Sequence, residues 1–225
     1  MSIILENNRL NAKTVNRERL ILDFCKNKIV IHLGCVDYPY LIEQYKSGNL
    51  LHEKICKVAK KTFGVDLNKE GIDFLKSLGY QDLFVCSVEA LSKISFEDKY
   101  EVIVAGELIE HLSNPGLFFE NVSSLMDDNT VLIITVPNAF SVKNFLRVLM
   151  RHELIHPDHV CYFSPSTIKH FCSRYNLELK EYYYYLLSPR GFFKKIIFLP
   201  LKYLIKFFIP YISDGLIFIV VKRKI

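Results

Sequence analysis

The chain has 225 residues, half of them hydrophobic, and its 29 Lys and Arg residues against 24 Asp and Glu residues give a net charge of +5. The 17 Phe and 13 Tyr residues, with few Gly and Pro, exclude a disordered chain and suffice for one sizeable core. We therefore predict a single domain over residues 1–225. The small positive charge does not favour nucleic acid as a partner.

Three features of the sequence bear on where the protein works. No apolar run approaches the roughly 20 residues that cross a bilayer. Residues 1–6 lack the basic and apolar blocks of a signal peptide. The six cysteines are irregularly spaced without a CxxC pair, which is typical of reduced thiols rather than a disulfide framework or a zinc site. We expect a cytoplasmic protein.

Residues 1–28 are expected to form a helical lead, with a helix over Arg17–Cys25. From residue 29 onward, apolar and β-branched runs alternate with helical patterns. The predicted strands are Ile29–Leu33, Lys61–Asp66, Leu83–Cys86, Tyr100–Ala105 and Thr130–Val136. Helices are predicted over Asn68–Leu78, begun by an asparagine cap, and over Leu117–Met126, begun by Asn114 and Pro115. Strands that are apolar throughout are typical of a parallel sheet covered on both faces, so the sequence predicts a doubly wound α/β fold.

The last part of the chain differs in composition. A Tyr-rich strand is predicted over Leu177–Leu187 and a final strand over Gly215–Val221, with an apolar and basic insertion, residues 190–212, before that last strand. Within the insertion, residues 190–206 contain five basic residues and no acid. Such a segment suits peripheral contact with the anionic inner face of a membrane. The alternative, favoured by Pro200 and Pro210, is a cover or dimer face packed on the sheet.

Candidate ligand-binding residues follow the predicted strands. Ligands of open α/β sheets bind beyond the carboxyl ends of the strands. Gly34 follows the first strand, Asp66 ends the second, Val88 and Glu89 follow the third, and Gly106 follows the fourth. A glycine lets the backbone approach a ligand, and an acid after the second strand suits ribose hydroxyls. Taken singly, Gly34 is equally explained as a tight turn and Asp66 as a helix cap.

Four segments together resemble class I S-adenosylmethionine-dependent methyltransferases, in the branch of the ubiquinone-pathway O-methyltransferases. They are residues 32–35 (HLGC), 64–68 (GVDLN), 105–112 (AGELIEHL) and 135–138 (TVPN), and the resemblance extends from Ile29 to about Glu181. It implies a Rossmann-like seven-stranded sheet with an antiparallel last strand, and S-adenosylmethionine as the cofactor. The cofactor-binding residues that it implies are His32, Gly34, Cys35, Asp66, Leu67, Val88, Glu89 and Gly106.

The sequence departs from this family in the first loop. His32 stands where the family has an acid, and Val36 and Tyr38 stand where it has glycines. A catalytically silent cofactor-binding or scaffold protein is therefore an alternative to an active enzyme.

Residues suited to catalysis follow the fourth strand. Glu107 and Glu110 share one face of a helical turn, His111 is adjacent, and His159 lies in a second polar segment downstream. Carboxylates and imidazoles are ligands for Mg²⁺, Mn²⁺, Fe²⁺ or Zn²⁺, and a metal would activate a hydroxyl acceptor. The alternative is a general base, His111 or His159.

The ExxEH…DH pattern also resembles small-RNA 2′-O-methyltransferases, in which two Glu and two His hold a metal. By that match Glu107, Glu110, His111 and His159 would be both catalytic residues and metal ligands, and His156 would be a turn or supporting residue.

These observations predict a methyltransferase that uses S-adenosylmethionine to O-methylate a hydroxyl of a small molecule, a sugar or a lipid-linked glycan, with or without a divalent metal. The alternatives are a metal-free methyltransferase acting on another acceptor, and the silent protein described above.

Overall fold

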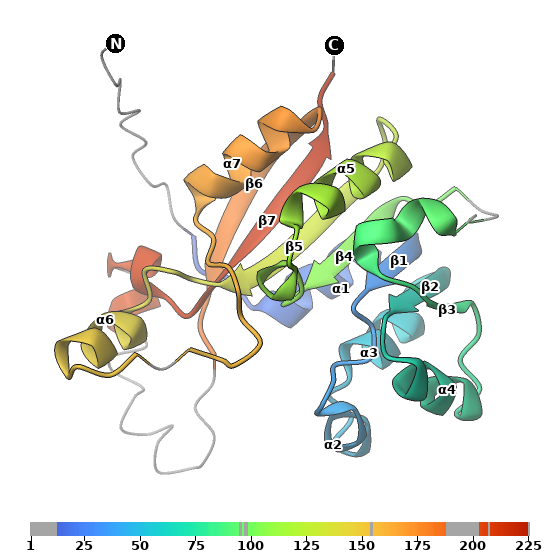
Figure 1. The fold of residues 1–225 in the computed structure, drawn as a ribbon, viewed down its shortest axis with the longest axis horizontal. Helices are drawn as coiled ribbons and strands as arrows, with labels where there is room; N and C mark the ends of the chain where they lie inside the picture. The colour runs from blue at the N-terminus through green and yellow to red at the C-terminus, as the bar shows by residue number, and fades with distance from the viewer. Residues whose placement is uncertain are drawn as a thin grey trace.

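The computed structural model describes residues 13–94, 96, 99–153, 155–187, 203–206 and 208–224. They contain a seven-stranded sheet with strand order β3-β2-β1-β4-β5-β7-β6 (Figure 1). The strands are β1 (Ile29–Leu33), β2 (Lys61–Asp66), β3 (Leu83–Val85), β4 (Val102–Gly106), β5 (Val131–Pro137), β6 (Leu177–Tyr185) and β7 (Gly215–Lys222). Strand β7 runs antiparallel to both β5 and β6, whereas β1 to β5 are parallel. The doubly wound sheet with an antiparallel last strand is confirmed.

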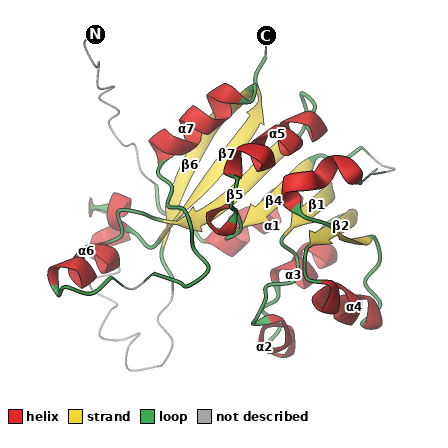
Figure 2. Ribbon diagram, in the orientation of Figure 1, coloured by secondary structure: helices red, strands yellow, loops and turns green. Residues whose placement is uncertain are grey.

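Helices cover both faces of the sheet (Figure 2). Ile31 and Leu33 of β1 face a core formed with α5 (Pro115–Leu125), α7 (Pro165–Arg174) and the 3-10 helix η1 (Val88–Lys93). Val30, on the opposite side of β1, packs with α1 (Arg17–Cys25) and α3 (Leu51–Val58). Further helices are α2 (Leu41–Lys46), α4 (Lys69–Ser77), α6 (Val142–Leu149), η2 (Ile109–His111) and η3 (Pro210–Ile212).

The predicted helix starts are confirmed by their hydrogen bonds. The Asn68 side chain accepts a hydrogen bond from the Gly71 amide at 2.7 Å, and the Asn114 side chain accepts one from the Leu117 amide at 3.3 Å. Each bond satisfies an amide that has no partner within the first helical turn. These caps fix where α4 and α5 begin, and therefore where the loops before them face the ends of β2 and β4.

Parts of the predicted terminal segments lie outside the described residues. They are residues 1–12 of the lead, and residues 190–202 and 207 of the insertion. Within the insertion, residues 203–206 are helical and η3 leads into β7. No helix among the described residues is both long and apolar enough to cross a bilayer. All six cysteines are free thiols.

Two histidines form a buried pair beneath the end of β1. Side chains along a strand alternate between its two faces, so that of His32 points away from those of Ile31 and Leu33 and toward α3. There its Nδ1 lies 3.2 Å from Nδ1 of His52. The rings are stacked with centroids 5.4 Å apart. Gly64 lies opposite His32 on β2, and a Cβ there would lie 2.9 Å from the His52 ring. Burial lowers the pKa of His52 to about 4 and the pKa of His32 well below its usual value.

This pair predicts a loss of stability in acid. The folded-state pKa of His52 lies below the unfolded value of about 6.5, so between these pH values the unfolded chain binds more protons and stability falls as the pH falls. From pH 7 to pH 5 this amounts to about 2 kcal/mol for one buried histidine. Urea unfolding at both pH values should show that His52→Gln reduces the drop by about this amount. The exposed His170→Gln is the matched control, and equal drops in the wild type and His52→Gln would contradict the prediction.

Candidate active site

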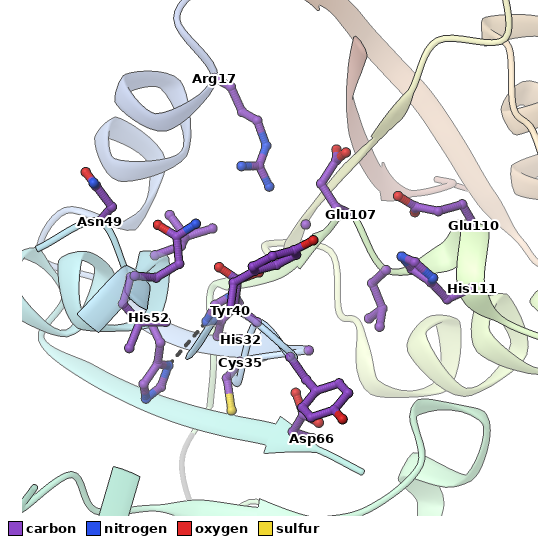
Figure 3. Close-up of a pocket in the computed structure, with 18 of the residues that line it drawn as sticks. Arg17, His32, Cys35, Tyr40, Asn49, His52, Asp66, Glu107, Glu110 and His111 are labelled. Atoms are coloured by element: carbon purple, nitrogen blue, oxygen red, sulfur yellow. Dashed lines mark hydrogen bonds between the residues drawn. The ribbon is translucent and has the colours of Figure 1, made fainter. Parts of the chain in front are cut away.

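A cavity of about 740 Å³ opens at the carboxyl ends of the central strands (Figure 3). It brings together nine of the predicted site residues: His32, Gly34, Cys35, Asp66, Gly106, Glu107, Glu110, His111 and His159. Leu67, Val88 and Glu89, also predicted, are not part of its wall. The cavity therefore joins most of the predicted cofactor residues to all four of the predicted catalytic residues.

One end of the cavity is formed by the loop after β1 and the end of β2. Gly34 has φ +73°, in the left-handed region that favours glycine, and a Cβ there would lie 3.1 Å from Leu108. The Asp66 carboxylate accepts hydrogen bonds from the amides of Val36 and Asn68, both at 2.9 Å. Each carboxylate oxygen keeps a further lone pair for a ligand, so Asp66 both fixes the loop and remains able to bind hydroxyls.

The Val36 side chain, in the loop after β1, is accommodated by a glycine elsewhere. The Val36 side chain is fully buried, and a Cβ at Gly71 of α4 would lie 2.2 Å from its Cγ1. Val36 thus points away from the cavity into a notch that α4 leaves open. Tyr38 is exposed and lines the cavity.

The three predicted cofactor residues outside the cavity wall have other surroundings. Val88, the first residue of η1, is buried in the core, and Leu67 is exposed. The Glu89 carboxylate accepts a hydrogen bond from the Asn114 amide at 2.7 Å, so it supports the start of α5.

Glu107 is the hub of a polar network at the end of β4. Its Oε1 accepts hydrogen bonds from the hydroxyls of Thr135 at 3.0 Å and Tyr185 at 2.7 Å. Thr135 Oγ1 in turn accepts a hydrogen bond from Arg17 Nε at 2.9 Å. Arg17 reaches over the end of β4, where a Cβ on Gly106 would lie 2.7 Å from its Nη2. The network places a guanidinium and a carboxylate in the middle of the cavity wall.

The side chain of Glu110 is buried, and its hydrogen bonding differs from that of Glu107. Neither of its carboxyl oxygens has a hydrogen-bond partner in the described part of the chain. Burial, and next the charge of Glu107, raise the pKa of Glu110 to about 9. Glu110 therefore holds a proton at neutral pH.

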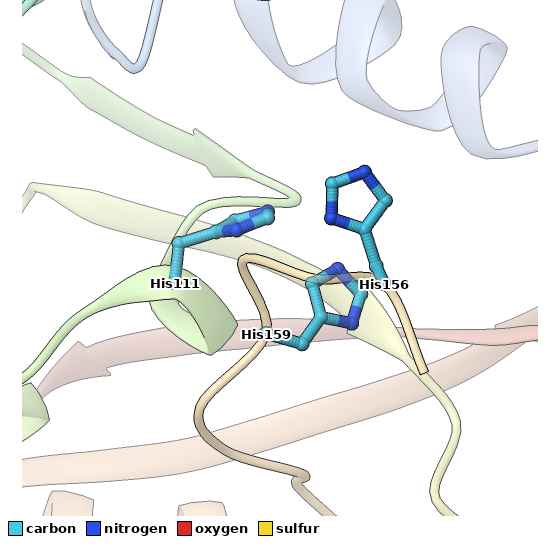
Figure 4. Close-up of side chains that lie close together, drawn as sticks. All are labelled: His111, His156 and His159. Carbon is cyan, nitrogen blue, oxygen red and sulfur yellow. The ribbon is translucent and has the colours of Figure 1, made fainter. Parts of the chain in front are cut away.

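Three histidines meet beside Glu110 (Figure 4). His111 ends η2, while His156 and His159 lie on the loop after α6, and one nitrogen from each ring lies within 4.8 Å of the others. His111 Nδ1 donates a hydrogen bond to the Asp158 carbonyl at 3.1 Å, and the Val160 amide donates to the Glu110 carbonyl at 2.9 Å. These bonds fasten the loop to η2. Burial and the two neighbouring rings lower the pKa of His159.

The predicted metal ligands are only partly brought together. His111 and His159 are adjacent, and His156, predicted as a supporting residue, is the third member of their cluster. Glu107 is instead held by Thr135 and Tyr185.

Sequence reasoning gave no site role to Arg17, His52, Thr135 or Tyr185, which reach the site from α1, α3, β5 and β6. Thr135 begins the motif of residues 135–138, whereas the other three lie outside the four motif segments. Tyr185 has room to reach Glu107 because its neighbour on β7 is Gly215, where a Cβ would lie 2.1 Å from the ring. The local signals were that motif and the Tyr-rich composition of β6.

Comparison with known proteins agrees with this geometry. A family model described as a methyltransferase domain matches residues 16–182. A ubiquinone biosynthesis O-methyltransferase of Pelagibacter ubique is 23% identical over 182 residues, covering 73% of this chain and 71% of its own length. The solved structure of an Archaeoglobus fulgidus SAM-dependent methyltransferase is similar with a TM-score of 0.58 at 17% identity, covering 92% of this chain and 91% of that one. The small RNA methyltransferase HEN1 is similar with a TM-score of 0.59 at 14% identity, covering 98% of this chain and 27% of its own.

The family match spans the first five strands of the sheet and every cavity residue except Leu187. The chain therefore belongs to the methyltransferase domain family and is a class I S-adenosylmethionine-dependent methyltransferase.

Proposed function

We propose that the enzyme transfers the methyl group of S-adenosylmethionine to a hydroxyl of a small-molecule acceptor. The observation that carries the proposal is the single cavity that joins Gly34 and Asp66 at one end to the histidine cluster at the other. The name of the Pelagibacter relative, an O-methyltransferase, supports oxygen as the accepting atom.

The cofactor would lie across the wall formed by β1, β2 and β4. Asp66 can accept hydrogen bonds from two ribose hydroxyls, and the exposed backbone of Gly34 allows close approach. We assign the methionine carboxylate to Arg17, whose guanidinium lies over Gly106 beside the cavity. This arrangement directs the sulfonium toward the end of the cavity where the histidines lie.

The reaction needs a group that removes the proton of the acceptor. A bond forms between the acceptor oxygen and the methyl carbon while the carbon–sulfur bond breaks, and the electron pair of that bond stays on sulfur as S-adenosylhomocysteine is formed. The hydroxyl proton passes to a ring nitrogen of His159, which lines the cavity at its histidine end. The buried Glu110 lies at the same end of the cavity.

A divalent metal is the alternative to a general base, and the cluster of three histidines is the observation that supports this alternative. Three imidazole nitrogens within 4.8 Å of one another suit a borderline ion such as Zn²⁺ or Fe²⁺, and the bond from His111 Nδ1 to a backbone carbonyl would orient its ring. His111, His156 and His159 would be the ligands, whereas Glu107 is already engaged. A bound metal would supply the positive charge that lowers the pKa of the acceptor hydroxyl.

Asp66→Asn should weaken cofactor binding. A hydrogen bond to a charged group contributes about 1.5–3 kcal/mol, so the dissociation constant of S-adenosylhomocysteine should rise about 10- to 100-fold. Calorimetry measures it, with Asp73→Asn, an exposed residue of α4, as the control. Unchanged affinity in a folded Asp66→Asn variant would remove Asp66 from the cofactor site.

His159→Gln should impair catalysis without impairing cofactor binding. Loss of a general base lowers kcat by about 10²- to 10⁴-fold, while the affinity for S-adenosylhomocysteine should stay within about threefold. The assay is transfer of a radiolabelled methyl group to a panel of catechols, hydroxybenzoates and sugars, with His170→Gln as the matched control. A His159→Gln variant that keeps its kcat would contradict the role of base.

Treatment with a chelator distinguishes the general-base mechanism from the metal-assisted one. If His159 is the base, protein treated with EDTA should retain its kcat, and His156→Gln should change kcat by less than about tenfold. Loss of activity on chelation, its restoration by Zn²⁺ or Fe²⁺ and the absence of that restoration in His156→Gln would support the metal in place of the general base.

A further inference from the structure

Arg17 and Glu107 place two opposite charges in one part of the cavity wall without forming an ion pair with each other. Thr135 lies between them: its hydroxyl oxygen accepts a hydrogen bond from Arg17 Nε at 2.9 Å, and its hydroxyl group donates one to Glu107 Oε1 at 3.0 Å. Among the residues that the structure describes, no ion pair involves either side chain. Figure 3 shows Arg17 reaching from α1 toward the end of β4, where the Glu107 carboxylate lies. The cavity therefore presents a cation and an anion close together.

Both groups keep hydrogen-bonding capacity for a ligand. The hydroxyls of Thr135 and Tyr185 fill the two lone pairs of Glu107 Oε1. Glu107 Oε2 accepts no hydrogen bond from the described part of the chain, and it is not among the buried atoms that lack a partner there, so it is open to the cavity. Arg17 uses the N–H of Nε alone, which leaves the N–H groups of its two terminal nitrogens.

A single buried side chain, that of Tyr185, contacts both charged groups. Its hydroxyl donates to Glu107 at 2.7 Å, and the guanidinium carbon of Arg17 lies 5.9 Å from the centre of its ring. A cation over an aromatic ring is attracted by the negative face of that ring. Because Tyr185 is buried, these two contacts hold the carboxylate and the guanidinium in place before any ligand binds.

The other acids near Arg17 leave Glu107 as the acid that is best placed to bind a ligand. Glu18 also lines the cavity, but its carboxylate forms an ion pair with Lys54 at 2.6 Å. Asp37 lines the cavity as well and lies within electrostatic range of both Arg17 and Glu107. Two carboxylates therefore surround one guanidinium, an arrangement that favours a ligand with a carboxylate and a larger positive charge.

We propose that Glu107 binds the α-ammonium group of S-adenosylmethionine while Arg17 binds its α-carboxylate. The two ligand groups are bonded to one carbon atom, so they must find opposite charges that lie close together, as those of Arg17 and Glu107 do. Glu107 then serves the cofactor rather than the acceptor, in contrast to the role expected from its spacing to Glu110. The assignment rests on the cofactor orientation given under the proposed function, and it is independent of the identity of the acceptor.

Calorimetry with a series of cofactor analogues tests the assignment. The series is S-adenosylhomocysteine, its analogue without the amino group, and methylthioadenosine, which lacks the whole amino acid end. In the wild type, loss of the amino group should weaken binding about 10- to 100-fold, because the Glu107 charge then has no partner on the ligand. Methylthioadenosine reports on the adenosine end alone.

Glu107→Gln removes the charge and keeps an oxygen for the hydroxyls of Thr135 and Tyr185. In this variant S-adenosylhomocysteine and its analogue without the amino group should bind within about threefold of each other, and the affinity for methylthioadenosine should stay unchanged. The matched control is Glu18→Gln, which removes an acid of the same cavity wall and should keep the ratio of the wild type. Circular dichroism checks that each variant is folded, and the wild-type series decides the question if Glu107→Gln does not fold.

Loss of the discrimination in Glu107→Gln and not in Glu18→Gln supports the assignment. A wild type that binds both compounds equally overturns it, as does loss of the discrimination in Asp37→Asn in place of Glu107→Gln. A folded Glu107→Gln variant that keeps the wild-type ratio but loses kcat at saturating cofactor also overturns it, and would return Glu107 to the acceptor. Failure of the proposed cofactor site is distinct, because methylthioadenosine would then not bind either, whereas an acceptor atom other than oxygen would leave all the binding ratios unchanged.

Discussion

The carboxylate of Glu107 joins four elements of the fold at one point, and the shape of the active site depends on it. Through Thr135 and Tyr185 it connects the end of β4 to β5 and β6, and through Thr135 it also reaches Arg17 on α1. Its backbone has φ +51°, a conformation that costs a non-glycine residue about 1–2 kcal/mol. The hydrogen bonds to its amide and carboxylate offset this strain and hold η2, and with it Glu110 and His111, in place.

The two carboxyl groups of the site have different surroundings. Glu107 accepts hydrogen bonds from two hydroxyls, whereas neither carboxyl oxygen of Glu110 has a partner among the described residues, and burial raises the pKa of Glu110. The polar network and the buried, unpaired carboxyl therefore give two parts of one cavity wall different chemical character.

Local patterns predicted the fold well, and they predicted the site only in part. The apolar and Tyr-rich runs predicted all seven strands of the sheet to within two residues at either end, and the asparagine caps placed the starts of α4 and α5, because these signals are confined to neighbouring residues. Arg17 and Tyr185 were beyond reach, since their roles depend on which strands lie side by side. The same holds for the cluster of three histidines: His156 and His159 are neighbours within one turn of the loop, but His111 meets them only because that loop folds back onto η2.

The packing of Val36 against Gly71 limits the substitutions that either position can accept. The two positions form one interlocked pair: with Val36 in place, any side chain at position 71 collides with it, and with glycine at both positions a void remains beneath the cofactor loop. A glycine at position 36 is therefore not a neutral substitution. It would be tolerated best together with a small side chain at position 71, yet that side chain collides with Val36 while Val36 remains. A double substitution is thus the natural route to a different pair of residues here, because each single substitution leaves either a void or a clash.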